Sequence, residues 1–381
     1  MAYFDNAATT FPKPEAVYSF IDKFYRSNGA SAGRGDYGAS LSAGALIAET
    51  RQLIQTLLHC PSKQVVFTPT ATVALNIVLQ GLIKTGIKEV YISPFEHNAV
   101  TRTLHAYQTA GAINVHKLAV SETMVFDLER IRYQFEDIKP DLIVVSHASN
   151  VFGVVAPIEK IFQLGKQFNA YTVADMAQTA GLIDCNVGST VFDFAIFAGH
   201  KTLYGPVGIS GFVMKPDIPL PPTIFGGTGY DSANQDMPLS LPERFEMGTM
   251  NICGIAGLHA ALTWINEVSI SSLRERESQN RKRLLEILDE YWFIRVVGNF
   301  PQNEHIGIVS CLIDGISSDS AGKIFNDCGI SVRTGLQCAP LAHEFMQTFP
   351  AGTIRFSVSY FTSEQDFQEL IQALDHIEEN I

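Results

Sequence analysis

The sequence predicts an α/β protein built around an open, mostly parallel β-sheet. The apolar β-type run 171–175 ends in an aspartate, and the run 192–201 ends in a histidine and a lysine. The run 142–145 is apolar throughout, as expected of a central parallel strand that is buried on both faces. Because ligands of such sheets bind outside the carboxyl ends of the strands, we expect Asp175 and Lys201 to project into one crevice.

The elements that precede this pair fit the same fold class. Pro14 predicts a helix that begins at Glu15, because proline is favoured at the start of a helix. Residues 65–68 form a short β-type run, which is followed by a turn of small residues and a helical stripe of aliphatic residues. Further strands are expected at 90–93 and 208–213.

The sequence also predicts a second, smaller domain. The segment 254–268 has the pattern of a helix that leaves the large domain, and an α+β arrangement follows it. We therefore expect an N-terminal segment at 1–15 that packs with the small domain, a large domain at 16–255, and a small domain at 256–381 that carries the Cys338 loop.

The composition is that of a folded protein and excludes several functions. The 381 residues are 46% hydrophobic and 17% charged, and the formal net charge is -12. A chain this acidic is a poor candidate for nucleic-acid binding, which requires a basic face. We expect neither a signal peptide nor a membrane span, because no basic-then-apolar start and no long apolar run is present. The six scattered cysteines argue against a metal site and favour a reducing cytoplasm.

The polar residues at the strand ends have a chemistry in common. A lysine in such a crevice can form a Schiff base with a carbonyl, and an aspartate can keep a pyridinium nitrogen protonated. Taken singly, a surface lysine and a helix-capping aspartate are the more frequent interpretations. The turn and helix start at Ala71 and Thr72 predict an anion site, although a threonine there is more often only a cap.

Three further positions invite a functional interpretation. His97 follows a strand and could stack on a flat ring, although a solvent-facing loop histidine is more frequent. Cys338 lies on a predicted turn, which favours an exposed thiol over the inert buried cysteine that is more usual. Arg355 lies inside an apolar strand and therefore requires an anionic partner, either a ligand carboxylate or an internal salt bridge.

These residues together carry a family resemblance. Gln178 lies one turn after Asp175, and His200 precedes Lys201. In this the chain resembles the pyridoxal 5'-phosphate (PLP) enzymes of fold type I, and more narrowly the class V aminotransferase-like group that contains the cysteine desulfurases. Three strings also match motifs of that group, in the same order along the chain: SHASNVFG at 146–153, FEMGTMN at 245–251 and RTGLQCAP at 333–340.

The resemblance implies a fold, a cofactor and a set of contacts. The fold is type I, with a mostly parallel seven-stranded sheet, and PLP is the cofactor. Lys201 would hold PLP as a Schiff base, with Asp175 at the ring nitrogen and His97 stacked on the ring. The remaining implied contacts are Gln178 and Asn150 at the ring oxygens, Ala71, Thr72 and His200 at the phosphate, Thr249 at the phosphate of the partner subunit, and Arg355, Asn150 and Arg34 around the substrate.

The implied activity is that of a cysteine desulfurase. The string RTGLQCAP resembles the catalytic loop of the group II desulfurases, which are similar to selenocysteine lyases. L-Cysteine would become L-alanine, with Lys201 as the general base and the sulfur left on Cys338 as a persulfide. A cytoplasmic homodimer with shared sites and a protein sulfur acceptor are also implied. Ala198 replaces a phosphate-binding serine, at a cost of roughly one hydrogen bond, and Gln337 replaces a histidine, which leaves the proton route near Cys338 undetermined.

Other functions are compatible with the same sequence. A selenocysteine lyase, or a cysteine/cystine C–S lyase, would share the fold, and the C–S lyase would yield pyruvate and ammonia instead of alanine. An aminotransferase would give no reason for an exposed Cys338. A non-catalytic PLP-fold regulator or binding protein is the alternative from a different class. The acidic charge and the intact Lys201, Asp175 and Arg355 argue against it. The sequence names neither the sulfur acceptor nor the pathway.

Overall fold

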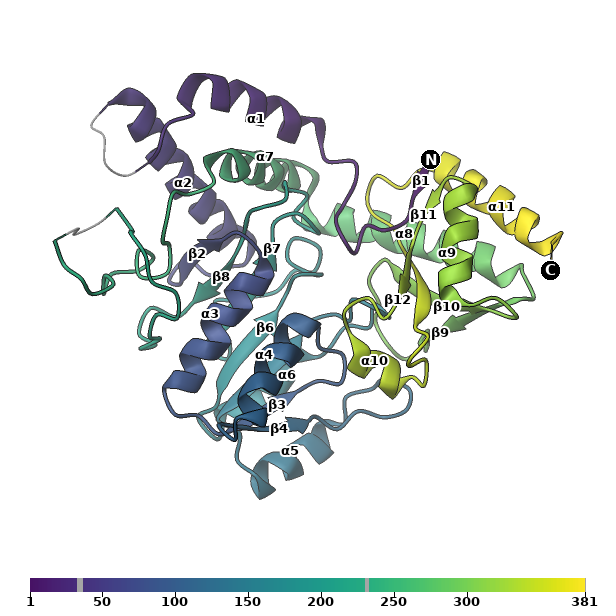
Figure 1. Cartoon of the computed structure of the whole chain (residues 1–381), viewed down its shortest axis with the longest axis horizontal. Coiled ribbons are helices and arrows are strands. Elements are labelled where there is room, and N and C mark those ends of the chain that lie inside the picture. The colour runs from purple at the N-terminus through teal and green to yellow at the C-terminus, as the bar shows by residue number, and fades with distance from the viewer. Residues whose placement is uncertain (33–36, 230–232, 381) are drawn as a thin grey trace.

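The structure, a computed structural model, describes residues 1–32, 37–229 and 233–380. The chain forms two units, with the N-terminus and α11 on the smaller one (Figure 1). The larger unit contains a seven-stranded sheet in the order β2-β8-β7-β6-β5-β3-β4, in which only β8 runs against the other strands. This confirms the predicted mostly parallel sheet. The strands are β2 (Gln64–Thr68), β3 (Glu89–Ile92), β4 (Asn114–Lys117), β5 (Leu142–Ser146), β6 (Tyr171–Asp175), β7 (Phe194–Ala198) and β8 (Ser210–Met214).

Helices cover both faces of this sheet, which is why its central strand is apolar throughout. Leu142 and Val144 of β5 pack in one core with α3 and α4. Ile143 and Val145 point to the opposite core, which α2, α5, α6 and α7 share. Each fully buried aliphatic side chain of this kind contributes about 1.5–3 kcal/mol. The helices of the larger unit are α1 (Glu15–Asn28), α2 (Gly38–Leu57), α3 (Ala71–Lys84), α4 (Asn98–Thr109), α5 (Leu128–Asp137), α6 (Ile158–Lys166) and α7 (Ile252–Val268).

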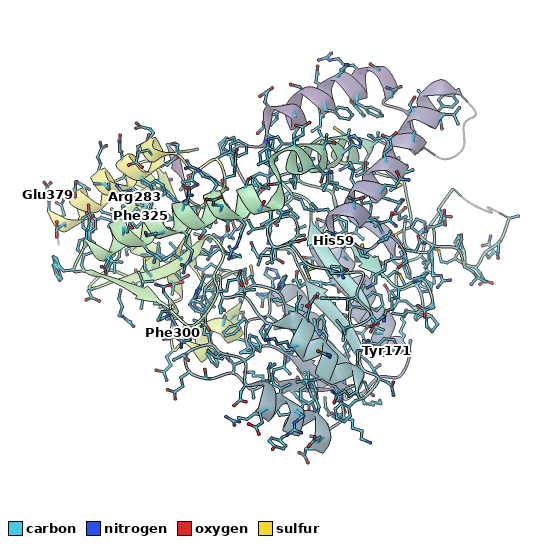
Figure 2. All side chains as sticks on the ribbon, turned by 180° about the vertical axis from the view of Figure 1, so that it is seen from behind. His59, Tyr171, Arg283, Phe300, Phe325 and Glu379 are labelled. Atoms are coloured by element: carbon cyan, nitrogen blue, oxygen red, sulfur yellow. The ribbon has the colours of Figure 1, made fainter. Side chains whose placement is uncertain are left out.

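The smaller unit is a four-stranded antiparallel sheet covered by helices. Its strand order is β12-β13-β10-β9, and α8, α9 and α11 supply the side chains of its core. Figure 2 shows Phe325 in this unit and Tyr171 in the larger one. No helix within 1–32, 37–229 or 233–380 is long and apolar enough to cross a membrane. The elements are β9 (Ile294–Val297), β10 (Ile308–Ile313), β11 (Ile330–Ser331), β12 (Arg333–Gly335), β13 (Thr353–Ser357), α8 (Ile270–Asp289), α9 (Ser318–Asp327), α10 (Pro340–Phe345) and α11 (Glu364–Glu378).

The packing of the N-terminal segment and of α7 shows how the chain is divided between the two units. The first strand, β1 (Ala2–Tyr3), pairs with β11 of the smaller unit, and Asp5 bridges to Ser357 of β13. The boundary expected between 255 and 256 falls inside α7, which packs against α1 and α2 of the larger unit. We therefore propose that the smaller domain begins after α7.

The register of the sheet brings the functional strand ends to one edge. Ser146 of β5 lies opposite Asp175 of β6, so both strands end at the same level. The chain leaves β7 at Ala198 and reaches Lys201 beyond the same edge. Two helices also begin there, α3 after β2 and α4 after β3. This edge is where ligands of open α/β sheets bind.

Candidate active site

A cavity of about 270 Å³ lies over the carboxyl ends of β5, β6 and β7. Its volume is near the lower end of the range for ligand cavities, which is about 300–1,000 Å³. Predicted site residues from the ends of three strands and the starts of two helices lie around this cavity. Eight of the predicted site residues line the cavity: Ala71, Thr72, His97, Asn150, Asp175, Gln178, His200 and Lys201.

Asp175 and Lys201 form the charged pair of this cavity. Asp175 is buried, and its Oδ1 accepts a hydrogen bond from the Ala177 backbone N–H at 3.0 Å. Burial raises the pKa of the Asp175 carboxyl, while the Ala177 N–H and Lys201 oppose that shift. Burial also lowers the pKa of the Lys201 amine to about 8, with Arg355 acting in the same direction and Asp175 against it. A lysine with so low a pKa is largely a free amine at mildly alkaline pH.

His97 is held as a neutral ring at the start of α4. Its Nδ1 accepts the Ala99 backbone N–H at 3.0 Å, so the ring hydrogen of the neutral form is on Nε2. Burial lowers the pKa of the His97 ring to about 4, and the nearby cations Lys201 and Arg355 add to this shift. The ring fixed in this way is uncharged and lines the cavity, so it adds no positive charge there.

The opposite end of the cavity is suited to an anion. Thr70, whose role the sequence did not indicate, caps α3 by accepting the Val73 N–H on its Oγ1 at 3.2 Å. The first-turn N–H groups of Ala71 and Thr72 have no partner within the helix, and the helix dipole is positive there. The Nδ1 of His200 is buried without a hydrogen-bond partner among the described residues. These donors fit a phosphate group.

Arg355 lies in β13 of the smaller unit and reaches the larger unit. Its Nη2 donates to Asp5 Oδ1 at 2.7 Å, and its Nη1 donates to the Asn150 carbonyl oxygen at 2.8 Å. The internal salt bridge that was one of the two interpretations of Arg355 is therefore present. The sequence did not indicate Asp5 as its partner. The Nε of Arg355 is buried and has no partner among the described residues. A guanidinium has five N–H donors, so it can hold Asp5 and still bind a second carboxylate.

Cys338 lies on the turn between β12 and α10, as predicted, and is exposed. Gln337 and Cys338 have φ values of 40° and 59°, a left-handed backbone that costs about 1–3 kcal/mol for each residue. Two hydrogen bonds of 2.7 Å hold this turn against the larger unit, from Asn98 N to the Cys338 carbonyl and from Asn150 Nδ2 to the Gln337 carbonyl. The thiol is thus exposed while its backbone is fixed.

The side chain of Gln337 points into the protein and fixes the same turn. Its Nε2 donates to the Thr353 carbonyl at 2.8 Å, so its Oε1 is the acceptor for His343 Nε2 at 2.9 Å. His343 is fully buried, and burial lowers the pKa of its ring to about 4. The other ring nitrogen then accepts from Thr348 Oγ1 at 2.7 Å. Gln337 therefore shapes the turn, and it is not placed to relay protons to solvent-exposed sulfur.

Replacing His343 with Leu is expected to loosen the turn of Cys338. The change removes the 2.9 Å hydrogen bond to the Oε1 of Gln337 and leaves that oxygen only the longer bond of 3.4 Å from Thr353 Oγ1. Loss of one such buried hydrogen bond costs about 0.5–1.5 kcal/mol of stability. We expect persulfide formation on Cys338 to slow while cofactor binding is kept, as measured by thiol mass and visible absorbance. Replacing the exposed His376 with Leu is the matched control. An unchanged rate of persulfide formation in the His343 variant would rule out this positioning role.

Other predicted site residues lie elsewhere or have other partners. The amide of Gln178 donates to the Ala7 carbonyl at 2.9 Å, which ties the N-terminal segment to the cavity. Thr249 is exposed and is not among the residues that line the cavity of its own chain. Arg34 lies outside the described residues. Within the described parts of the chain, no group of His, Cys, Asp and Glu is suited to hold a metal ion.

A buried carboxyl that the sequence did not indicate supports the cavity from behind. Glu96, which precedes His97, accepts hydrogen bonds from Ser93 Oγ at 2.5 Å and from the backbone and hydroxyl of Ser146 at 2.8 and 2.7 Å. Burial raises the pKa of Glu96 to about 7, and Asp175 acts in the same direction. Glu96 therefore links the ends of β3 and β5. The only sequence feature that could have pointed to Glu96 as a site residue is its position next to His97.

Comparisons with known proteins agree with this geometry. Residues 2–370 match the family model described as aminotransferase class-V. A "probable cysteine desulfurase" of Xylella fastidiosa strain Temecula1 is 30% identical, over 98% of this chain and 90% of that protein. One of the same name from Methanothermobacter thermautotrophicus is 29% identical, over 98% and 94%.

A solved structure shows the same fold over the whole chain. The apo structure of the cysteine desulfurase from Thermococcus onnurineus NA1 has a TM-score of 0.91 and 26% identity, covering 100% of this chain and 95% of that one. The family match extends over nearly the entire sequence and includes both units. The chain belongs to the aminotransferase class-V family, and its fold is that of the cysteine desulfurases.

Proposed function

We propose that this protein is a PLP-dependent cysteine desulfurase of group II. It converts L-cysteine to L-alanine and keeps the sulfur on Cys338 as a persulfide. One observation carries the proposal: Lys201, Asp175 and the anion site surround one cavity, with Arg355 and an exposed cysteine close to it. The relatives named as probable cysteine desulfurases support it.

The residues of the cavity fit PLP. The buried Asp175 carboxyl is suited to a protonated ring nitrogen, and Lys201 is an amine suited to an aldehyde. The start of α3 and the unpartnered Nδ1 of His200 are suited to the phosphate. When bound, PLP supplies an electron sink for cleavage at the substrate's carbon atoms. Ala198 is buried and offers no hydroxyl at the cavity wall, in keeping with one hydrogen bond fewer to the phosphate.

The chain's own groups bind the substrate and move its proton. Arg355 holds the carboxylate of L-cysteine. It uses the guanidinium N–H groups that are not engaged in the hydrogen bonds to Asp5 and Asn150. Lys201, with a pKa lowered to about 8, removes the α-proton as a free amine. His97 stays neutral and lines the cavity.

Cys338 accepts the sulfur. Its thiolate attacks the sulfur of the substrate, the carbon–sulfur bond breaks, and a sulfur–sulfur bond forms on the enzyme. The substrate carbon takes a proton, so L-cysteine and one thiol give L-alanine and one persulfide. Lys201 and Arg355 are both close enough to Cys338 to interact electrostatically with its sulfur.

We further propose a homodimer in which Thr249 contacts the phosphate of the partner subunit. Thr249 is exposed, and the larger unit also has exposed apolar side chains in α1, in α2 and its N-cap, and in the segment between β8 and α7. In Figure 1, α2 and the described parts of the segment between β8 and α7 lie on the side away from the smaller unit, and α1 runs along the top of the larger unit. Exposed apolar surface of this kind marks interfaces. The side chains are Tyr18, Tyr25, Tyr37, Leu41, Ile224, Phe225 and Leu239.

The cellular setting follows from the thiol chemistry. All six cysteines are free of disulfides, which suits a reducing compartment, and we propose the cytoplasm. Such a compartment also preserves the reactive thiol of Cys338 between reactions. We keep Arg34 as a proposed substrate contact, on the family resemblance alone.

The products of the reaction with L-cysteine test the function. We expect the PLP-loaded protein to give one L-alanine for each persulfide formed, with no pyruvate, when no thiol acceptor is added. Alanine and pyruvate are measured by chromatography, and the persulfide by the mass of the intact protein. Pyruvate and ammonia in place of alanine would assign the protein to the C–S lyases instead.

A further inference from the structure

Two more cavities are lined by Cys338. A cavity of about 620 Å³ shares Thr72 and His97 with the cofactor cavity and also reaches Cys338. A larger one of about 750 Å³ lies between α4, the strands β3 and β4, and the segment from β12 to α10, and it too is lined by Cys338. Cys338 thus borders both the cavity that shares residues with the cofactor cavity and this larger cavity, which we name the outer groove. The outer groove shares Asn98 and Arg102 with the cavity of about 620 Å³, and none of its lining residues lines the cofactor cavity.

The outer groove is basic, in a protein with a formal net charge of -12. Arg102, His105, Lys117 and Arg333 line it, and no Asp or Glu does so among the described residues. None of these four side chains forms an ion pair or a hydrogen bond within the described parts of the chain. The three cations among them, Arg102 of α4, Lys117 of β4 and Arg333 of β12, favour a ligand with several negative charges.

The floor of the outer groove is apolar. Ile92, Leu104, Leu336 and Leu341 line it together with the cations. A ligand that fills this groove therefore has an apolar body as well as acidic groups on more than one side. A short acidic peptide segment meets both conditions, whereas a compact thiol with one or two carboxylates covers only part of the surface.

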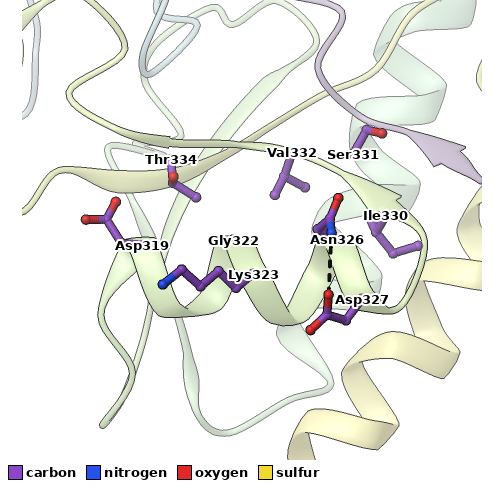
Figure 3. A pocket seen from close by; sticks show the side chains of 9 residues that line it. All are labelled: Asp319, Gly322, Lys323, Asn326, Asp327, Ile330, Ser331, Val332 and Thr334. Atoms are coloured by element: carbon purple, nitrogen blue, oxygen red, sulfur yellow. Dashed lines mark hydrogen bonds between the residues drawn. The ribbon is translucent and has the colours of Figure 1, made fainter.

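A neighbouring cavity of about 560 Å³ shows that this charge pattern is particular to the outer groove. That cavity shares Thr334 with it but lies along α9, where Asp319, Lys323 and Asp327 give it mixed charge (Figure 3). It offers no net attraction to an anion, and Cys338 does not line it. The outer groove is the cavity of this pair that combines positive charge with access to the thiol.

We propose that the outer groove binds an acidic, cysteine-containing segment of the protein that accepts the sulfur. The inference rests on the proposed desulfurase function. The thiolate of the acceptor attacks the outer sulfur of the Cys338 persulfide, and the sulfur–sulfur bond to Cys338 breaks. The persulfide is then on the acceptor, Cys338 leaves as a thiolate, and no external oxidant or reductant is consumed.

Short synthetic peptides that contain one cysteine test the proposal. The PLP-loaded enzyme is first charged with persulfide by L-cysteine and then offered an acidic, a neutral or a basic peptide of equal length. We expect the acidic peptide to be persulfidated about tenfold faster than the neutral one at low salt. This ratio should fall as salt is added, since the screening length shrinks to about 3 Å at 1 M. Formation of alanine in the charging step reports separately on the desulfurase function.

Charge-reversal variants connect this preference to the outer groove. In the double variant Arg102→Glu and Lys117→Glu, the rate ratio of acidic to neutral peptide should fall to one or below. The matched control reverses the exposed Lys23 and Lys323, which lie outside the outer groove, and should keep the wild-type ratio. Taking the ratio within each variant removes any general change in activity.

Two results would overturn the proposal. One is a charged enzyme that transfers sulfur to acidic and neutral peptides at the same rate. The other is a preference for mercaptosuccinate, a small dianionic thiol, that equals the preference for the acidic peptide, which would assign the outer groove to small thiols. Neither result would question the formation of alanine and persulfide.

Discussion

Replacing Lys201 with Ala is expected to abolish both cofactor attachment and turnover. The variant lacks the amine that the cavity offers to an aldehyde and the base that removes the α-proton. Loss of a general base alone lowers rates by about 10²–10⁴. We expect the visible absorbance of the PLP-loaded protein to disappear and alanine production to fall to background. Lys201→Arg is the matched variant, because it keeps the positive charge without a free amine.

The lowered pKa of Lys201 adds a pH dependence to this prediction. Only the neutral amine attacks an aldehyde, and its fraction rises as the pH passes upward through the pKa. With a pKa of about 8, PLP uptake by the cofactor-free protein should speed up with pH and level off above about pH 8. An ordinary lysine would level off only above about pH 10.4. A plateau at that higher pH would show that burial does not tune this amine.

Replacing Cys338 with Ser is expected to stop sulfur transfer while the cofactor remains bound. A hydroxyl is a far weaker nucleophile than a thiolate at neutral pH. Removal of a nucleophile costs about a thousandfold in rate or more. We expect the visible absorbance to match that of the unchanged protein, since Cys338 does not line the cofactor cavity, and persulfide to be absent from the protein mass.

Cys328→Ser provides the control for this variant. Cys328 is a half-buried cysteine at the end of α9 and lines none of the three cavities that surround the site. The control should keep full production of alanine and persulfide. Full desulfurase activity in Cys338→Ser would show that another group accepts the sulfur.

Much of the fold could be predicted because its signals are local. The runs 142–145 and 171–175 are apolar and short, and each coincides with a strand to within one residue. The strand expected from residue 192 begins at Phe194 instead. Asp193 is the reason, because its carboxylate accepts the Thr172 N–H and pairs with Lys166 and Lys215 outside the ladder.

Eight residues that line the cavity could be named from the sequence, but their hydrogen-bond partners could not. Arg355 was expected to need an anion, and the structure supplies Asp5, which is 350 residues away in the chain. The sequence shows that Gln337 departs from the family pattern. Its link to His343 depends on a turn whose backbone is left-handed at two successive residues, and no local sequence signal specifies that.

The sequence by itself determined the central strands of the sheet, the polar groups at their ends and the family that they indicate. Each of these depends on neighbours in the chain, through the period of apolar residues and the chemistry of single side chains. Only the tertiary structure decided which cations remain unpaired and which of them line a cavity together with Cys338. Charges that are far apart in the chain act on each other through space, so the outer groove exists only once α4, β4 and β12 have packed together.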